Sequence, residues 1–130
     1  METRLLTAWT VKGYAEIMHE QSIVESILSL ALENAGKAQA NRILKINLVV
    51  GELSGVVDEA VEFYFNFLSK NTIASEAHLS FQHIPMQLRC RKCSTVFTPE
   101  KMELQCPECK EQQIEILAGR ELYIESLEVD

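Results

Sequence analysis

The stretch CRKCSTVFTPEKMELQCPEC, residues 90–109, decides how this chain is organised. Cys90 and Cys93 enclose two residues, twelve residues follow, and Cys106 and Cys109 repeat the same spacing. Two such knuckles place four thiolates around one point, which suits the tetrahedral coordination of Zn²⁺. Closed four-cysteine sites leave no open position for water or substrate, so they are usually structural. The spacing therefore predicts a zinc ribbon whose metal holds a small module together.

Three other interpretations of the cysteines are weaker. A thioredoxin-like CxxC pair would be redox-active, but a second pair lies nearby and neither pair sits in a βαβ pattern. Rubredoxin-like iron could take the same spacing, yet Ser94 and Lys110 follow the knuckles where the rubredoxin pattern has glycine. Four unliganded core cysteines are less expected still. Residues 86–116 are also too few to bury a sufficient core alone, and zinc–thiolate bonds supply the missing stability.

The composition of the whole chain bounds the class of protein. At 130 residues it fits one compact domain, or a small domain with a metal-held module. Hydrophobic residues make up 47% of the chain, which is enough for a real core. The net charge of −7 argues against broad binding to nucleic acid or anionic membranes. Because no apolar run could span a bilayer and no secretory signal is evident, the expected compartment is the cytoplasm, where paired cysteines favour metal over disulfides.

Two helices are expected ahead of the ribbon. The first covers about residues 20–38, where apolar side chains recur at helical spacing. Ser22 with Glu25 three residues later has the form of a capping box, and Gly36 is the expected stop. The second begins at Asp58, which can cap it. Its inward-facing residues are predicted to be Val61, Tyr64, Phe65 and Leu68.

The aromatic run from Phe63 to Phe67 makes this second helix apolar almost all round. Such a helix should be well buried or should meet a partner. The simplest interpretation of the run is core, and docking of a partner is the second.

Three strands complete the expected fold. One at residues 43–50 has a strongly apolar face and ends in a turn at residues 51–55, and another covers residues 77–85. The last covers residues 121–129, with a bulge or an edge indicated where Glu125–Ser126 interrupts the alternation. The fold class predicted is α/β (α+β): a small mixed β-sheet packed with two helices, plus an inserted four-cysteine zinc ribbon.

Two histidines lie on the strand at residues 77–85 and neither has a close partner for a metal site in the sequence. His78 is expected on the exposed face. His83 is in phase with Leu79 and Phe81, so it is predicted to be a partly buried structural histidine.

Three features in this order resemble the HypA-type hydrogenase maturation family, the nickel metallochaperones. They are Met18-His19-Glu20 ahead of a helix, the Val-Gly-Glu-Leu-Ser-Gly segment at residues 50–55, and the paired CxxC ribbon ahead of a final strand. The resemblance covers residues 18–130. It implies a protein that is not an enzyme, and that helps a maturation GTPase of the HypB type load nickel into the large subunit of NiFe hydrogenase. In some bacteria such proteins also serve urease.

The resemblance places the nickel site at Met18, His19 and Glu20 and makes the zinc of the ribbon structural. If the chain starts at Met18, its α-amine and the amide and imidazole of His19 can chelate Ni²⁺, and nitrogen ligands in a plane suit this d⁸ ion. The α-amine titrates at roughly 7.7 to 8, so binding weakens in mild acid. Glu20 is expected to play a supporting role in the first helical turn.

Residues 1–17 depart from the family pattern, because they turn the amine of Met18 into an amide. Either the working protein begins at Met18 and the upstream residues come from an erroneous start or an added segment, which we prefer, or the extension is native and moves the nickel site or is removed. Trp9, the only tryptophan, lies in this extension. The expected domains are residues 1–17 as an extension, 18–85 with 117–130 as the nickel-binding α/β domain, and 86–116 as the zinc ribbon.

The leading hypothesis is therefore nickel delivery, with structural Zn²⁺, transient Ni²⁺, a GTPase and a hydrogenase subunit as partners, and no nucleic acid or membrane. The alternative is a zinc-ribbon module that binds nucleic acid or acts in transcription. Against it, acidic residues balance the basic residues of the ribbon and no basic face with interleaved aromatics emerges. A metal-dependent hydrolase lacks an open zinc position. A monomer and a homodimer that exchanges an edge strand are both allowed.

Overall fold

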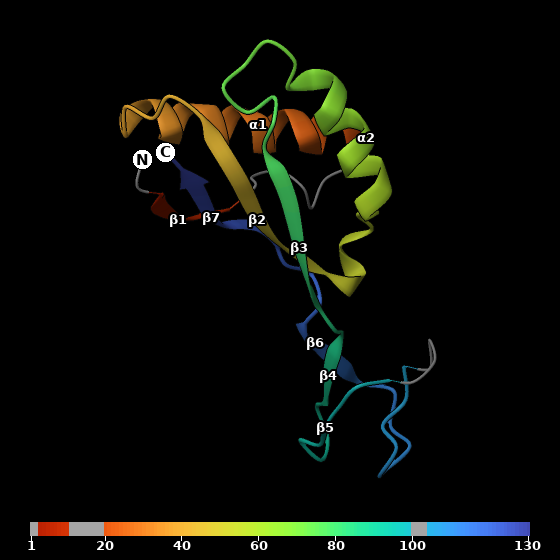
Figure 1. Ribbon diagram of the computed structural model, residues 1–130. Helices are drawn as coiled ribbons and strands as arrows, with labels where there is room; N and C mark the ends of the chain where they lie inside the picture. The colour runs from red at the N-terminus through yellow and green to blue at the C-terminus, as the bar shows by residue number, and fades with distance from the viewer. Residues whose placement is uncertain (1–2, 11–19, 100–103) are drawn as a thin grey trace.

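The structure is a computed structural model that describes residues 3–10, 20–99 and 104–130. A four-stranded sheet with two helices forms one end of the molecule, and a three-stranded ribbon forms the other (Figure 1). The elements in chain order are β1 (Arg4–Thr10), α1 (Glu20–Lys37), β2 (Ile43–Gly51), a short 3₁₀ helix (Glu52–Ser54), α2 (Asp58–Leu68), β3 (His78–Ile84), β4 (Gln87–Cys90), β5 (Val96–Phe97), β6 (Ile114–Ala118) and β7 (Leu122–Val129).

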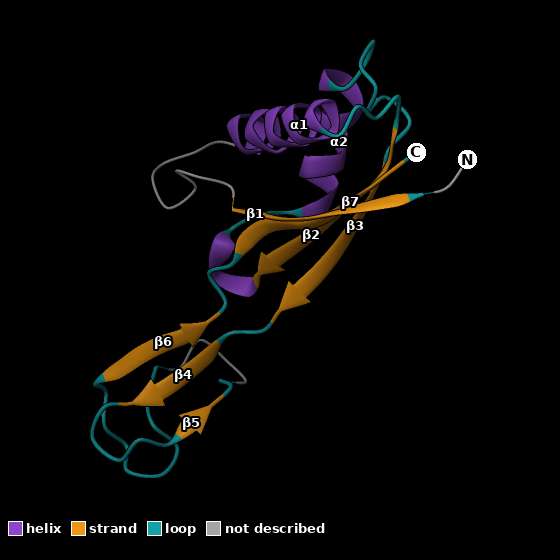
Figure 2. Ribbon diagram, turned by 90° about the vertical axis from the view of Figure 1, so that its left-hand side faces the viewer, coloured by secondary structure: helices purple, strands orange, loops and turns teal. Residues whose placement is uncertain are grey.

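The main sheet has the strand order β1-β7-β2-β3. β2 and β3 run parallel, whereas β7 is antiparallel to both β2 and β1, so the sheet is mixed. Both helices lie on the same face of this sheet (Figure 2). The predicted fold class, a small mixed sheet packed with two helices and an inserted four-cysteine ribbon, is confirmed. Neither of the described helices is long and apolar enough to cross a membrane.

α1 packs its apolar stripe against the sheet, as its spacing predicts. The helix begins at Glu20, so Ser22 lies inside its first turn and is not the N-cap; the predicted capping box is wrong. The helix runs past Gly36 and stops because Gln39 turns left-handed, with a φ of 57°. The N–H of Ala40 then donates to the carbonyl five residues back at 2.9 Å, which closes the helix as a Schellman motif.

α2 has one buried face and one exposed face. Val61 and Phe65 are fully buried in the core, as predicted. Phe63 and Phe67 are 69% and 66% exposed, so the interpretation of the aromatic run as core is wrong for these two residues. The reason is that α2 packs mainly against α1 among the described elements, which leaves its other side to solvent.

His83 lies near the end of β3, and its side chain is 58% exposed. The prediction of a partly buried histidine is therefore wrong, because burial fades along this face of the strand beyond Leu79. Nε2 of His83 lies 2.8 Å from Oδ2 of Asp58, the first residue of α2. The ring also stacks on Phe81, with ring centroids 6.5 Å apart. This histidine–carboxylate pair joins residues 25 apart in the sequence, so periodicity could not predict it.

β7 contains the bulge predicted at Glu125–Ser126. Ser126 pairs with Asn47, but the next pair joins Ile124 to Leu48, so Glu125 is the extra residue. β7 is not an edge strand, however. β1, which comes from the segment expected to be an extension, pairs along its outer side.

Candidate metal centre

The two knuckles of the ribbon are built alike. The N–H of Ser94 donates to the carbonyl of Cys90 at 2.9 Å, and Lys110 repeats this bond with Cys106 at 3.0 Å. In both knuckles the N–H of the first cysteine donates to the carbonyl five residues further on, at 2.9 Å. Ser94 and Lys110 have φ angles of 64° and 65°. The two positions where rubredoxin has glycine thus have the left-handed backbone that glycine adopts without strain.

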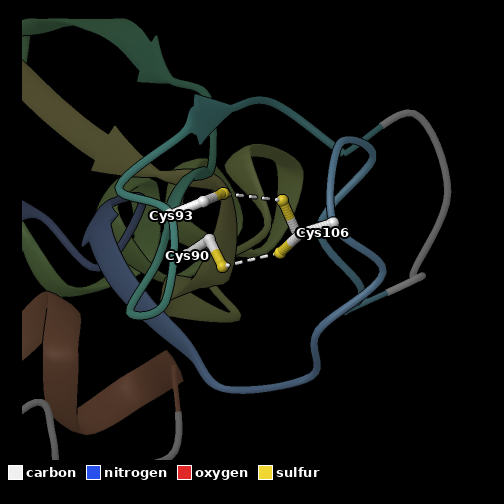
Figure 3. A group of neighbouring side chains, drawn as sticks. Cys90, Cys93 and Cys106 are labelled. Carbon is white, nitrogen blue, oxygen red and sulfur yellow. Dashed lines mark hydrogen bonds between the residues drawn. The ribbon is translucent and has the colours of Figure 1, made fainter.

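The four sulfur atoms converge on one point, as Figure 3 shows for Cys90, Cys93 and Cys106. All four Sγ atoms lie within 4.8 Å of one another. Sγ of Cys90 is 3.5 Å from that of Cys109, and Sγ of Cys93 is 3.6 Å from that of Cys106. A tetrahedral ion with bonds of about 2.3 Å keeps its sulfur ligands about 3.8 Å apart, so the cluster fits such an ion. Among the described residues it is the one such group of metal-ligating side chains.

The four thiols differ in burial and in the hydrogen bonds that they form. Cys90 and Cys106 are buried, Cys109 is partly buried and Cys93 is exposed. Hydrogen bonds from the side chain and then the backbone of Thr95 lower the pKa of Cys93 to about 6. A hydrogen bond with the backbone of Glu111 acts to lower the pKa of Cys109. Burial and hydrogen bonds with the other three thiols outweigh it and raise this pKa to about 12. Four thiolates therefore need a cation between them, which is the chemistry of a metal site.

Charged side chains of the ribbon are paired with one another. Nζ of Lys92 lies 3.6 Å from Oε2 of Glu111, which links the two knuckles. Arg89 and Arg91 both reach Glu115 on β6, Arg91 at 3.9 Å. Positive charge therefore lies close to the cysteines, but carboxylates neutralise it. The described part of the ribbon lacks the basic face that nucleic-acid binding requires.

Gly51 is the point where the main sheet meets the chain that leaves the ribbon. Its N–H donates to the carbonyl of Glu121 at 2.6 Å. A Cβ on Gly51 would lie 2.2 Å from the carbonyl oxygen of Gly119, closer than non-bonded atoms can approach. Only glycine fits there. The sequence indicated a turn at this position but not the close backbone contact.

Glu52 holds the chain that enters the ribbon. One of its carboxylate oxygens accepts the N–H of Met86 at 2.8 Å, just before β4 begins. The neighbouring Leu53 donates its N–H to the carbonyl of Gly119 at 2.6 Å, just after β6 ends. Residues 51–53 therefore form hydrogen bonds with both chain segments that connect the ribbon to the main sheet, the one before β4 and the one after β6. Sequence reasoning missed this role, because a turn signal does not reveal what the turn contacts.

The predicted nickel-binding residues lie only partly within the described structure. Met18 and His19 are outside the described residues, and Glu20 is the partly buried first residue of α1. Gln21 follows it and lines an apolar hollow together with Phe63, Tyr64, Phe67 and Leu68. The exposed aromatic rings of α2 therefore lie beside the helix start where the Met-His-Glu motif ends.

The fold and the site together define the class of protein. It has two modules, a mixed sheet covered by helices and a ribbon whose four cysteines form a candidate metal site. More specifically, the chain belongs to the family described as "Hydrogenase/urease nickel incorporation, metallochaperone, hypA", which matches residues 18–129. The resemblance noted in the sequence is confirmed, and residues 1–17 lie outside the match.

Individual relatives agree with the family match. The hydrogenase maturation factor HypA of Dehalococcoides mccartyi is 45% identical over 113 residues, which are 87% of this chain and 95% of the relative. That of Caldanaerobacter subterraneus is 38% identical over 114 residues, 87% of this chain and all of the relative. The solution structure of the nickel metallochaperone HypA from Helicobacter pylori is 30% identical, with a TM-score of 0.62 over 86% of this chain and 97% of that one.

Proposed function

We propose that this protein binds Ni²⁺ and assists its insertion into NiFe hydrogenase during maturation of that enzyme. The observation that carries the proposal is the family match, which starts at the Met-His-Glu motif and runs through the cysteine ribbon to residue 129. The family description also names urease, which makes urease the second candidate client. In this role the protein is a carrier and not an enzyme.

The nickel ligands in this proposal are nitrogen atoms of Met18 and His19. With Met18 at the N-terminus, its α-amine joins the backbone amide and the imidazole of His19, a donor set that suits planar Ni²⁺. Glu20 supports the site from the first turn of α1. The domains that go with this function are residues 18–85 with 117–130 for nickel, 86–116 for the ribbon, and 1–17 as an extension.

The nickel site is tested by His19→Ala in protein that begins at Met18. Specific nickel binding should be lost in calorimetry, while zinc content and fold stay unchanged, because the substitution removes the imidazole ligand and leaves the backbone amide in place. His78→Ala is the matched control, since His78 is exposed on β3. Unchanged nickel affinity in His19→Ala, or an equal loss in His78→Ala, would contradict the assignment.

We further propose that the ribbon holds structural Zn²⁺, because four thiolates with no open position suit this ion. Cys90→Ala removes a fully buried ligand. It should loosen or unfold the ribbon and lower the zinc content measured by elemental analysis. Undiminished zinc in this variant would show that Cys90 is not a zinc ligand and would contradict the assignment.

The partners proposed are a maturation GTPase of the HypB type and the hydrogenase large subunit, with no nucleic acid or membrane. The hollow with exposed Phe63 and Phe67 supports a protein partner, because exposed aromatic rings are enriched at interfaces. Glu59 and Glu62 are exposed on the same helix, so a basic partner surface suits this site. The cytoplasm suits the cysteines, since thiols stay reduced there.

A further inference from the structure

β1 pairs with nearly the full length of β7 along its outer edge. The two strands pair antiparallel from Arg4 opposite Val129 to Thr10 opposite Tyr123. The segment that makes this strand lies outside the family match, which begins at Met18. β1 is therefore an additional strand that is not part of the region matched by the family.

Arg4 anchors the first end of β1. Its Nε donates to the carbonyl of Asp130 at 2.9 Å, and its Nη1 donates to the carbonyl of Ala38 at 2.8 Å. One side chain thus ties β1 both to the end of the chain and to the loop after α1. Such a forked contact needs a guanidinium.

Two apolar side chains fix which face of β1 is inward. Leu6 and Trp9 pack against the hydrophobic core, whereas Leu5 is 62% exposed. Trp9 also lines a hollow on the flank of α1 with Leu30 and Lys37. The strand is held by side chains as well as by its backbone.

Ala8 adapts β1 to the bulge in β7. It falls between the pairs Thr7–Ser126 and Trp9–Ile124, across from Glu125, which is the bulged residue in the pairing of β7 with β2, and its φ is 62°. A small residue tolerates this backbone better than a β-branched one. The site thus favours a small residue at the fifth position of an occupant that begins at Arg4.

The charges along the outer edge of β7 also determine which strand can pair with it. β7 carries Glu125 and Glu128 and is followed by Asp130, whereas β1 has Arg4 and no acidic residue. Pairing β7 with its own copy would bring carboxylates of the two copies close together, which opposes self-association. A neutral or basic strand fits this edge better than a second copy of the chain.

We infer that the outer edge of β7 is a strand-addition site for an extended segment of a partner protein, and that residues 4–10 occupy this site in cis. The partner segment has the chemistry of β1: no acidic residue, a cation at its first position and large apolar residues at its third and sixth. Backbone pairing gives such a site its affinity, and the alternating side chains give it specificity.

The test in trans uses zinc-loaded protein that begins at Met18. This part folds on its own, since 97% of the solved Helicobacter pylori chain is covered by 86% of this one. The probe is a synthetic peptide of residues 1–12, which contains the only tryptophan of the sequence. Binding should shift the Trp9 emission to the blue, and light scattering should show a monomeric protein without the peptide.

Peptide variants distinguish the inward face from the outward face. Leu6→Ser should weaken binding about tenfold, because it removes a partly buried side chain that packs against the core, and Leu5→Ser should leave it within about twofold. Absence of any emission shift, equal effects of the two variants, or a dimer that excludes the peptide would overturn the inference. Nickel is absent from these experiments, so their failure leaves the proposed nickel function untouched.

The full chain supplies the test in cis. Arg4→Glu and Leu6→Ser should move the Trp9 emission to the red and expose the indole to a soluble quencher, whereas Leu5→Ser should not. The full chain carrying Trp9→Phe should bind the peptide of residues 1–12 at least about tenfold more weakly than protein that begins at Met18 does. The reason is that β1 of the full chain already fills the site. Equal binding by the two proteins would show that β1 does not occupy the edge.

Discussion

Thr95 forms hydrogen bonds with one cysteine of the proposed zinc site. Its Oγ1 lies 3.1 Å from Sγ of Cys93, and its hydrogen bonds lower the pKa of that thiol to about 6. A thiol must lose its proton before it binds a metal ion. A lowered pKa therefore keeps Cys93 available as a ligand further into the acid range.

Thr95→Val tests this role, because it keeps the shape of the side chain and removes the hydroxyl. The pKa of Cys93 should rise toward its ordinary value of 9.0, so protons compete with zinc at a higher pH. We expect zinc release on acidification to move to higher pH and the zinc affinity at pH 7 to fall about tenfold. A chelator titration measures both. The exposed Thr98 provides the control Thr98→Val, and identical release curves for the two variants would contradict the account.

The cysteines themselves could be predicted from the sequence, because their spacing is local and the geometry of a knuckle follows from a few residues. Thr95 could not be singled out, since a threonine two residues after a cysteine has no specific spacing signal. The pair of His83 and Asp58 escaped prediction for a different reason. It depends on how the end of β3 meets the start of α2, which is a tertiary contact.

At the scale of the elements, β2 ends at Gly51, and the fold has no room for a side chain at this position. Gly51→Ala should destabilise the protein by about 3 kcal/mol, because its Cβ would meet the backbone of Gly119. Gly36→Ala is the matched control: that glycine lies in α1 with nothing within 4 Å of the added Cβ. It should stabilise the protein by about 0.5–1 kcal/mol. Urea unfolding of zinc-loaded protein measures both changes, and destabilisation by both variants alike would contradict the close contact at Gly51.

Strongly periodic elements were predictable, and weakly patterned ones were not. α1 and β2 follow from their apolar spacing, although the end of α1 depends on the left-handed Gln39 rather than on Gly36. β1 was not predicted as a strand. Its stability comes from β7 and from contacts such as that of Arg4 with Asp130, 126 residues away, so its own sequence carries little signal.

At the scale of the whole molecule, the 51–53 segment joins the main sheet, with its two helices, to the ribbon. Glu52→Ala removes the acceptor for the N–H of Met86. We expect zinc binding to persist while the ribbon moves more independently of the main sheet. The exposed Glu59 gives the control Glu59→Ala.

NMR relaxation of backbone amides measures this change. In Glu52→Ala, the ribbon and the main sheet should show different apparent tumbling times, and in Glu59→Ala they should stay as in the parent protein. Unchanged relaxation in Glu52→Ala would show that the backbone bonds of Gly51 and Leu53 suffice to hold the ribbon.

The arrangement of the two modules could be predicted only in outline. The order of helices, strands and knuckles indicated a sheet with an inserted ribbon, because each element has a local pattern. Contacts between the modules, and the exposed Phe63 and Phe67 beside the start of α1, depend on packing that periodicity does not encode. These tertiary features are where the structure adds most to the proposed function.

The most direct measurement of the central claim is a Ni²⁺ titration of two zinc-loaded forms, the full chain and protein that begins at Met18. Visible absorbance reports the coordination geometry, and calorimetry reports the affinity and stoichiometry. If the free amine and His19 bind the metal, only the form that begins at Met18 takes up one Ni²⁺ tightly with the spectrum of a planar site. Equal binding by the two forms would contradict the claim, because the amine would then be dispensable.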